Sequence, residues 1–237
     1  MGMAVSAEDR RRLAVGWHGL TAVLIAVCVV AQLVLTFRGT SVLVDENGVP
    51  LANLPTRLVR FFTYFTIQSN LLAMVTAATL ALRPDRDGPL WRVARVGAVV
   101  GMTVTFVVYL VALAPILDLS GVAFWTDLGF HIAAPLLTVG GWLLLGPWPR
   151  LDGRSCAWFV GWPVCWILYV LALGASTDWY PYPFLDVAKH GYGRVLVNCV
   201  LVAVLLLGIA ALFSGLDTRL SRRAAASRSD VQPAPRG

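Results

Sequence analysis

Charged residues are scarce in this chain of 237 residues. Asp, Glu, Lys and Arg together make up 14% of it, while hydrophobic residues make up 58%. Ordinary soluble domains carry about 25% charged residues, so the composition excludes a domain of that kind. The mean hydropathy of +0.73 is likewise higher than that of an ordinary soluble domain. The sequence therefore predicts a polytopic membrane protein.

Cysteine is scarce as well. The four cysteines, Cys28, Cys156, Cys165 and Cys199, lie in or beside apolar segments and show neither CxxC nor His-rich spacing. This pattern indicates neither a disulfide framework nor a zinc site, and we expect no metal and no cofactor. The net charge of +6 does not indicate a nucleic-acid partner, because the basic residues are scattered through short loops and the C-terminal tail.

Long apolar runs are abundant. They cover about residues 14–37, 60–82, 94–117, 128–147, 156–175 and 192–214. Each is near the roughly 20 residues that a helix needs to cross a bilayer. We therefore expect an all-α fold of six transmembrane helices over 14–214, with kinks at Pro135 and Pro163. The flanking segments are a cytoplasmic N-terminal segment, 1–13, and a cytoplasmic tail, 215–237, which we expect to be disordered.

The distribution of basic residues predicts the orientation. Fourteen of the 19 Lys and Arg residues fall in the N-terminal segment, the second and fourth loops and the tail. The positive-inside rule then places both termini in the cytoplasm, as an even number of helices requires. The Arg- and Ala-rich composition and the lack of organelle signals favour the cytoplasmic (inner) membrane of a bacterium.

A cluster of polar residues opens the second apolar run. Hydroxyl and amide groups inside a bilayer cost free energy unless they are hydrogen-bonded. At helical spacing most of the cluster falls on one face, and only Gln68 turns away from it. Two interpretations are open, since the cluster either joins helices or forms a functional site. Its members are Thr63, Thr66, Gln68, Ser69 and Asn70.

A histidine inside the fourth apolar run is the second candidate. A membrane-embedded histidine such as His131 is a functional hypothesis, because it can act as a base near neutral pH. A purely structural bond to a neighbouring helix is the alternative. Asp127, one turn earlier, is predicted to be the N-cap of this helix. A role in orienting His131 is less favoured, since a four-residue step on one helix rarely gives the needed geometry.

The predicted orientation brings these candidates to the outer leaflet, together with the loop 178–186. A hydroxyl nucleophile needs a base within hydrogen-bonding reach and donors for the developing oxyanion. Thr66 and His131 would supply the nucleophile and the base, and Asn70 or Ser69 a donor. This constellation would suit hydrolysis of a lipid ester that stays partly in the membrane.

Three short motifs resemble those of a known family when taken in order. They are Tyr64-Phe65-Thr66, Gly129-Phe130-His131 followed by Pro135, and Tyr182-Pro183-Phe184-Leu185-Asp186. Together they make residues 14–214 similar to the androgen-induced-gene family of integral membrane proteins and to its bacterial six-helix relatives. Animal members of that family are threonine hydrolases that cleave fatty acid esters of hydroxy fatty acids.

The resemblance implies Thr66 as nucleophile and His131 as base, with membrane lipid around the protein and a lipid ester as substrate. Thr63 also precedes an aromatic residue and is the alternative nucleophile; Thr66 is favoured because Tyr64 and Phe65 precede it. A different class stays open, namely a non-catalytic membrane protein that binds or moves a small lipophile. The residues expected to support the site or bind substrate are Thr63, Ser69, Asn70, Asp127, Tyr182 and Asp186.

Overall fold

The computed structural model describes residues 6–39, 52–148 and 153–229, and these residues form helices joined by short connections, without a strand. The α-helices are α1 (Ala7–Arg38), α2 (Leu54–Thr63), α3 (Phe65–Leu82), α4 (Pro89–Val108), α5 (Gly121–Leu128), α6 (Ala134–Leu145), α7 (Gly153–Thr177) and α8 (Val187–Ser229). Two π-helical segments, η1 (Tyr109–Leu113) and η3 (Gly129–Ala133), and two 3₁₀ turns, η2 (Ala114–Ile116) and η4 (Pro183–Leu185), complete the described chain.

Six helical stretches in the described ranges are long and apolar enough to cross a membrane. They are Glu8–Arg38, Phe65–Leu82, Pro89–Ile116, Gly121–Leu145, Trp158–Thr177 and Val187–Arg223. Large apolar side chains also cover the outside of the bundle, for example Val27 on α1 and Leu207 on α8, which are 62% and 52% exposed. Such a surface suits lipid rather than water. The prediction of a six-helix, multi-pass membrane protein is thus confirmed.

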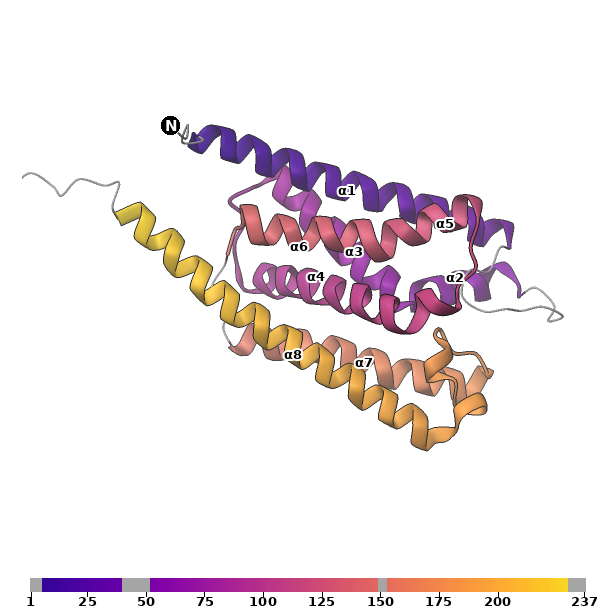
Figure 1. The fold of residues 1–237 in the computed structure, drawn as a ribbon. Coiled ribbons are helices and arrows are strands. Elements are labelled where there is room, and N and C mark those ends of the chain that lie inside the picture. Colours follow the sequence, from indigo (N-terminus) through magenta and orange to yellow (C-terminus); the bar gives the residue numbers. More distant parts are fainter. Residues whose placement is uncertain (1–5, 40–51, 149–152, 230–237) are drawn as a thin grey trace, which may run out of the picture.

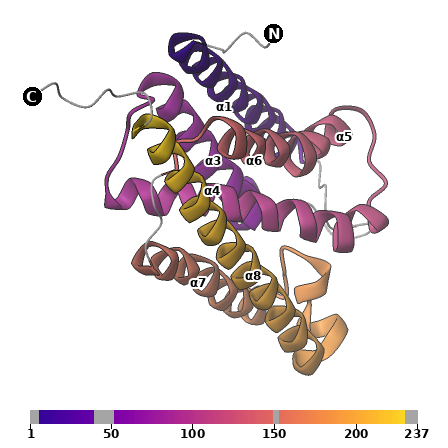
Figure 2. The ribbon, with the colours of Figure 1, turned by 60° about the vertical axis from the view of Figure 1, so that its left-hand side comes forward.

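Helix α4 lies at the centre of the arrangement. On one side it packs with α3 and α6, on which α1 packs in turn, and on the other side α7 and α8 cover it (Figures 1 and 2). Its middle is buried between these layers, and Val99 and Val100 are almost completely inaccessible. The start of α1 and the end of α8 lie at the same end of the bundle (Figure 1), as six crossings require.

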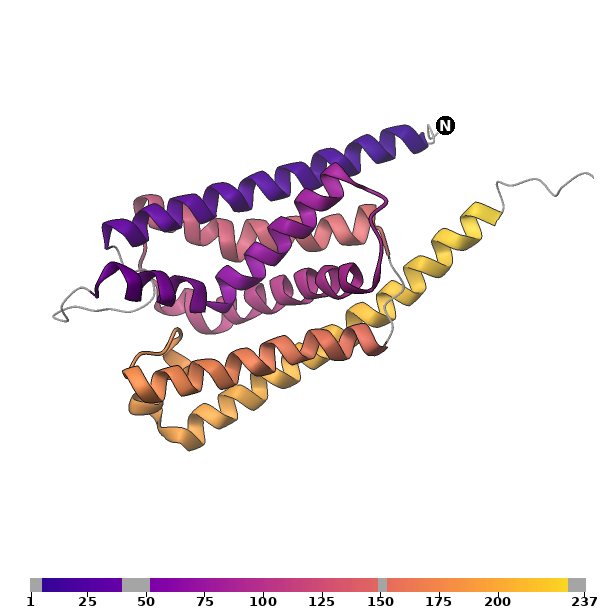
Figure 3. The same ribbon diagram turned by 180° about the vertical axis from the view of Figure 1, so that it is seen from behind.

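The second apolar run contains a break that the sequence analysis did not predict. Tyr64 adopts an extended conformation (φ −62°, ψ 127°) and separates α2 from α3 (Figure 3). Backbone groups freed by the break find side-chain partners. Trp166 Nε1 donates to the Thr63 carbonyl (2.7 Å), and Gln68 Nε2 donates to the Phe62 carbonyl (3.0 Å). Because of the break, Thr66 lies in the first turn of α3.

The fourth span begins earlier than predicted. Its helix starts at Gly121 after the N-cap residue Ser120, so Asp127 lies inside the helix and is not its N-cap. The segment 121–127 is mostly apolar and continues the helical pattern toward the N-terminus. The π-helical segment η3 ends two residues before Pro135, which has no N–H to donate to the carbonyl four residues earlier.

The tail is helical over most of its length, contrary to the prediction of disorder. Helix α8 continues to Ser229, and Asp217 within it is fully buried. Ala, Arg and Leu, which dominate this stretch, are strong helix formers and extend a helix already started in the bundle. Residues 1–5 and 230–237 of the two predicted cytoplasmic segments lie outside the described residues.

Candidate active site

Thr66 and His131 meet at one end of the bundle. Thr66 Oγ1 lies 3.2 Å from His131 Nε2, and both side chains are buried. The threonine comes from the first turn of α3 and the histidine from η3, which contact one another. A pair 65 residues apart in the chain therefore has the geometry of a nucleophile and its base.

The hydrogen bonds of His131 define its tautomer. Nδ1 lies 3.1 Å from the backbone carbonyl oxygen of Asp127 and 2.9 Å from Asp127 Oδ1. Since a carbonyl oxygen can only accept, Nδ1 carries the proton, and Nε2 is left as the acceptor facing the Thr66 hydroxyl. Asp127 thus contacts His131 in the way that the sequence analysis considered the less favoured of its two roles. The wide turn of η3 changes the spacing of side chains from that of an α-helix.

Tyr109 completes the support of the histidine. Its ring stacks on the imidazole at 4.3 Å between centroids with an interplanar angle of 11°, and its hydroxyl hydrogen-bonds Asp127. A π-face in this position stabilises an imidazolium. Sequence reasoning did not single out Tyr109, and its only signal was a polar-tipped aromatic residue within an apolar run.

Tyr182 reaches the same threonine from the loop before α8. Its hydroxyl accepts the Thr66 backbone N–H (3.1 Å) and lies 3.2 Å from Thr66 Oγ1. Because it accepts the N–H, its own proton is free to point at Oγ1 or at an oxygen beside it. The ring is buried and held between Trp166 and Phe184, the latter in parallel stacking at 5.4 Å.

The other candidates of the polar cluster occupy different places. Asn70 Nδ2 donates to the carbonyls of Thr66 (2.9 Å) and Phe130 (3.3 Å), so it ties α3 to η3. Ser69 Oγ lies 3.1 Å from the Thr66 carbonyl oxygen and 2.9 Å from Thr105 Oγ1. Both groups are thus engaged on the carbonyl of Thr66 rather than beside its hydroxyl.

Two further candidates lie away from His131. Thr63 Oγ1 donates to the Val59 carbonyl (2.8 Å) and contacts the Tyr169 hydroxyl (3.2 Å). Asp186 Oδ1 accepts the Lys189 backbone N–H (3.0 Å) at the start of α8. Thr63 is therefore bonded to its own helix and to α7, and Asp186 is a helix cap.

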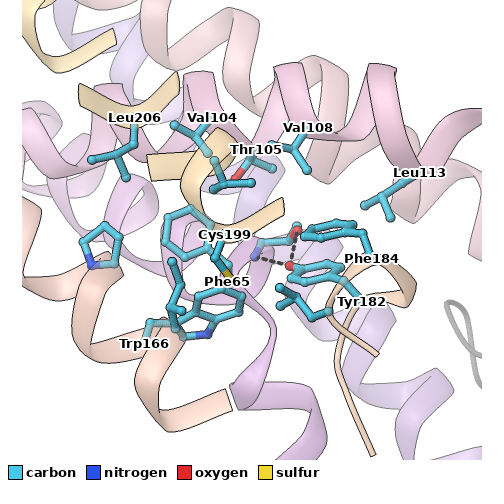
Figure 4. Close-up of a pocket in the computed structure, with 15 residues that line it drawn as sticks. Phe65, Val104, Thr105, Val108, Leu113, Trp166, Tyr182, Phe184, Cys199 and Leu206 are labelled. Carbon is cyan, nitrogen blue, oxygen red and sulfur yellow. Dashed lines mark hydrogen bonds between the residues drawn. The ribbon is translucent and has the colours of Figure 1, made fainter. Parts of the chain in front are cut away.

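An apolar slot opens beside Thr66, between α3, α4, α7 and α8 (Figure 4). The space inside it that is not filled by atoms is about 570 Å³ when its open mouth is included, and the enclosed cavity is about 50 Å³. Thr66 and Tyr182, which are hydrogen-bonded to each other, line one part of it, and the dashed lines in the figure mark hydrogen bonds at the labelled Tyr182. The rest is lined mainly by apolar side chains, among them Val104, Val108, Ile167 and Leu206.

Comparisons of the chain with protein-family models, curated proteins and solved structures give no match. In the described part of the chain, no three His, Cys, Asp or Glu side chains gather as ligands of a metal ion would.

Proposed function

We propose that this protein is an integral membrane hydrolase of lipid esters, with Thr66 as nucleophile and His131 as general base. One observation carries the proposal, namely the buried chain of contacts from Thr66 Oγ1 to His131 Nε2 and from His131 Nδ1 to Asp127. A hydroxyl nucleophile is activated by a base that is itself oriented by a hydrogen-bond acceptor, and His131 and Asp127 have this arrangement beside Thr66. The resemblance to the androgen-induced-gene family supports the same roles.

The proposed reaction proceeds in two steps. His131 Nε2 takes the Thr66 proton while Oγ1 attacks the acyl carbon of the ester, and the imidazolium then protonates the departing alcohol. A water molecule, deprotonated by Nε2, then attacks the acyl carbon of the acyl-threonine. As the bond from that carbon to Oγ1 breaks, the imidazolium returns its proton to Oγ1, which releases the free acid and regenerates the Thr66 hydroxyl. Asp127 and Tyr109 stabilise the imidazolium in both steps, and the Tyr182 hydroxyl donates to the oxyanion.

The location of the site fits a membrane substrate. The positive-inside rule puts the α2–α3 break and the loop 178–186 in the outer leaflet of a bacterial inner membrane, with both termini in the cytoplasm. A site at that depth meets water from one side and acyl chains from the other. Fatty acid esters of hydroxy fatty acids, or esters of similar character, are the substrates we propose.

The test is labelling of the purified, detergent-solubilised protein with a fluorophosphonate probe, which phosphonylates activated hydroxyls. We expect the wild type to be labelled and the variants Thr66→Ala and His131→Ala to remain unlabelled. Thr63→Ala is the matched control, since it removes a buried threonine hydroxyl three residues away that does not contact His131. It should retain labelling.

Two results would overturn the proposal. One is a correctly folded wild type that is neither labelled nor releases fatty acid from a panel of lipid esters. The other is labelling that depends on Thr63 and not on Thr66. The first result would favour a non-catalytic protein that binds or moves a small lipophile, in which Thr66→Ala lowers ligand affinity and there is no turnover to lose.

A further inference from the structure

The slot beside Thr66 runs from the proposed nucleophile into the bundle. Its outer part is lined by Thr66 and Tyr182, and its inner part by Val104 on α4 and Leu206 on α8. We propose that this slot holds the unbranched acyl chain of the substrate and that Val104 and Leu206 limit the length of that chain. The inference rests on the proposed function for the position of the reacting carbon.

The lining selects an apolar occupant. Most of its side chains are hydrocarbon or aromatic, and its two threonine hydroxyls and its tyrosine hydroxyl already have partners. Thr105 is bonded to Ser69, and Thr66 and Tyr182 are bonded to each other. A polar ligand would lose its bonds to water in this slot without gaining new ones, whereas a hydrocarbon chain loses nothing.

The depth of the slot follows from the helix register. Asn198 Nδ2 donates to the Phe184 carbonyl (2.8 Å), which places the adjacent Cys199 at the level of the loop that carries Tyr182. Leu206 lies two turns further along α8, or about 10 Å at 1.5 Å per residue. That length fits a medium-chain acyl group and is too short for an extended long-chain one.

Packed side chains close the inner end. One turn before Val104, Val100 is fully buried, and two turns beyond Leu206 the ring of Phe213 packs edge-on against Trp142. These residues belong to the same buried core as the slot wall. Cores of this density leave no room for further methylene groups, so the chain must end near Leu206.

The experiment compares hydrolysis of para-nitrophenyl esters of butyric, octanoic and palmitic acid. We expect the wild type to prefer octanoate. Leu206→Phe should lower the octanoate-to-butyrate ratio of kcat/KM about 10-fold or more, because several methylene groups lose their place. Leu207→Phe is the matched control: it adds the same ring to the neighbouring residue on the outside of α8 and should change the ratio less than about 2-fold.

A shortening variant tests the same wall in the opposite direction. Leu206→Ala should raise the palmitate-to-octanoate ratio of kcat/KM, because it frees the space of the leucine side chain at the inner end of the slot and adds no bulk to the wall. Equal ratios in the wild type, Leu206→Phe and Leu206→Ala would overturn the assignment of the slot.

A second measurement is independent of turnover. An octanoyl ester with a diazirine at the end of its chain is photolysed with the Thr66→Ala variant, and the labelled peptides are mapped by mass spectrometry. Labelling on α4 and α8 around Val104 and Leu206 supports the slot even if no variant hydrolyses any ester, in which case only the proposed function fails. Hydrolysis by the wild type together with labelling elsewhere overturns the slot and keeps the function.

Discussion

Replacing Asp127 by Asn isolates what the carboxylate contributes to His131. Nδ1 has two acceptors, the neutral backbone carbonyl and the charged carboxylate of Asp127. The substitution removes the negative charge of the carboxylate and leaves the backbone carbonyl unchanged. The carbonyl keeps the proton on Nδ1, so the tautomer is preserved. The loss is therefore smaller than the roughly 10⁴-fold seen in serine proteases, where the same change produces the wrong tautomer.

The magnitude follows from the lost charge. A hydrogen bond to a charged group contributes about 1.5–3 kcal/mol, which corresponds to a decrease of about 10- to 150-fold in rate. The measurement is the second-order rate constant of fluorophosphonate labelling of Asp127→Asn relative to the wild type. Asp118→Asn, the same change at an exposed loop residue, is the control and should react at the wild-type rate.

Two outcomes would refute this reasoning. An unchanged rate would mean that the carboxylate does not stabilise the imidazolium. A loss as complete as that of His131→Ala, in a variant that keeps its helical content and melting temperature, would mean that the backbone carbonyl does not hold the tautomer.

The two remaining predictions concern the oxyanion donor and the packing that supports His131. Tyr182→Phe keeps the ring but removes the hydroxyl beside Thr66 Oγ1. The kcat for hydrolysis of the octanoate ester should fall about 10²- to 10³-fold. An unchanged kcat would exclude Tyr182 as the hydrogen-bond donor to the oxyanion. A methyl group at Gly129 would overlap Cys28 Sγ, so Gly129→Ala should destabilise the protein by about 1–3 kcal/mol. The melting temperature of Gly129→Ala in detergent should therefore fall. Gly161→Ala is the control and should melt as the wild type does, because no atom lies near the added methyl group. If adding Cys28→Ala to Gly129→Ala does not restore the melting temperature, the overlap with Cys28 is contradicted.

Hydropathy and composition were sufficient for the membrane architecture. Every crossing helix needs about 20 apolar residues regardless of its neighbours, so six such runs predicted six helices, and the structure has them. The ends of these helices were less predictable. The fourth crossing helix begins after Ser120, well before Asp127, and α8 continues to Ser229.

The candidate site was predictable in its members but not in its connections. Thr66 and His131 were identified by their polarity within apolar runs, because a polar side chain in lipid costs free energy unless it has a partner or a function. The break at Tyr64 was invisible, because it exists only where side chains of α7, such as Trp166, bond the freed backbone. Its effect is to place Thr66 in the first turn of α3.

The contacts within the candidate site depend on tertiary structure. The sequence favoured Thr66 over Thr63 only by the two aromatic residues before it, since both threonines have the same chemistry one turn apart. The packing shows that Thr66 contacts His131 while Thr63 bonds its own helix. The packing also stacks the ring of Tyr109 on the imidazole of His131 and brings Asp127 into contact with His131 Nδ1. Which polar groups must be shielded from the bilayer follows from the sequence, because the free-energy cost of burying a polar group is a property of each residue. The structure decided which of them meet, because that is a property of the helices around them.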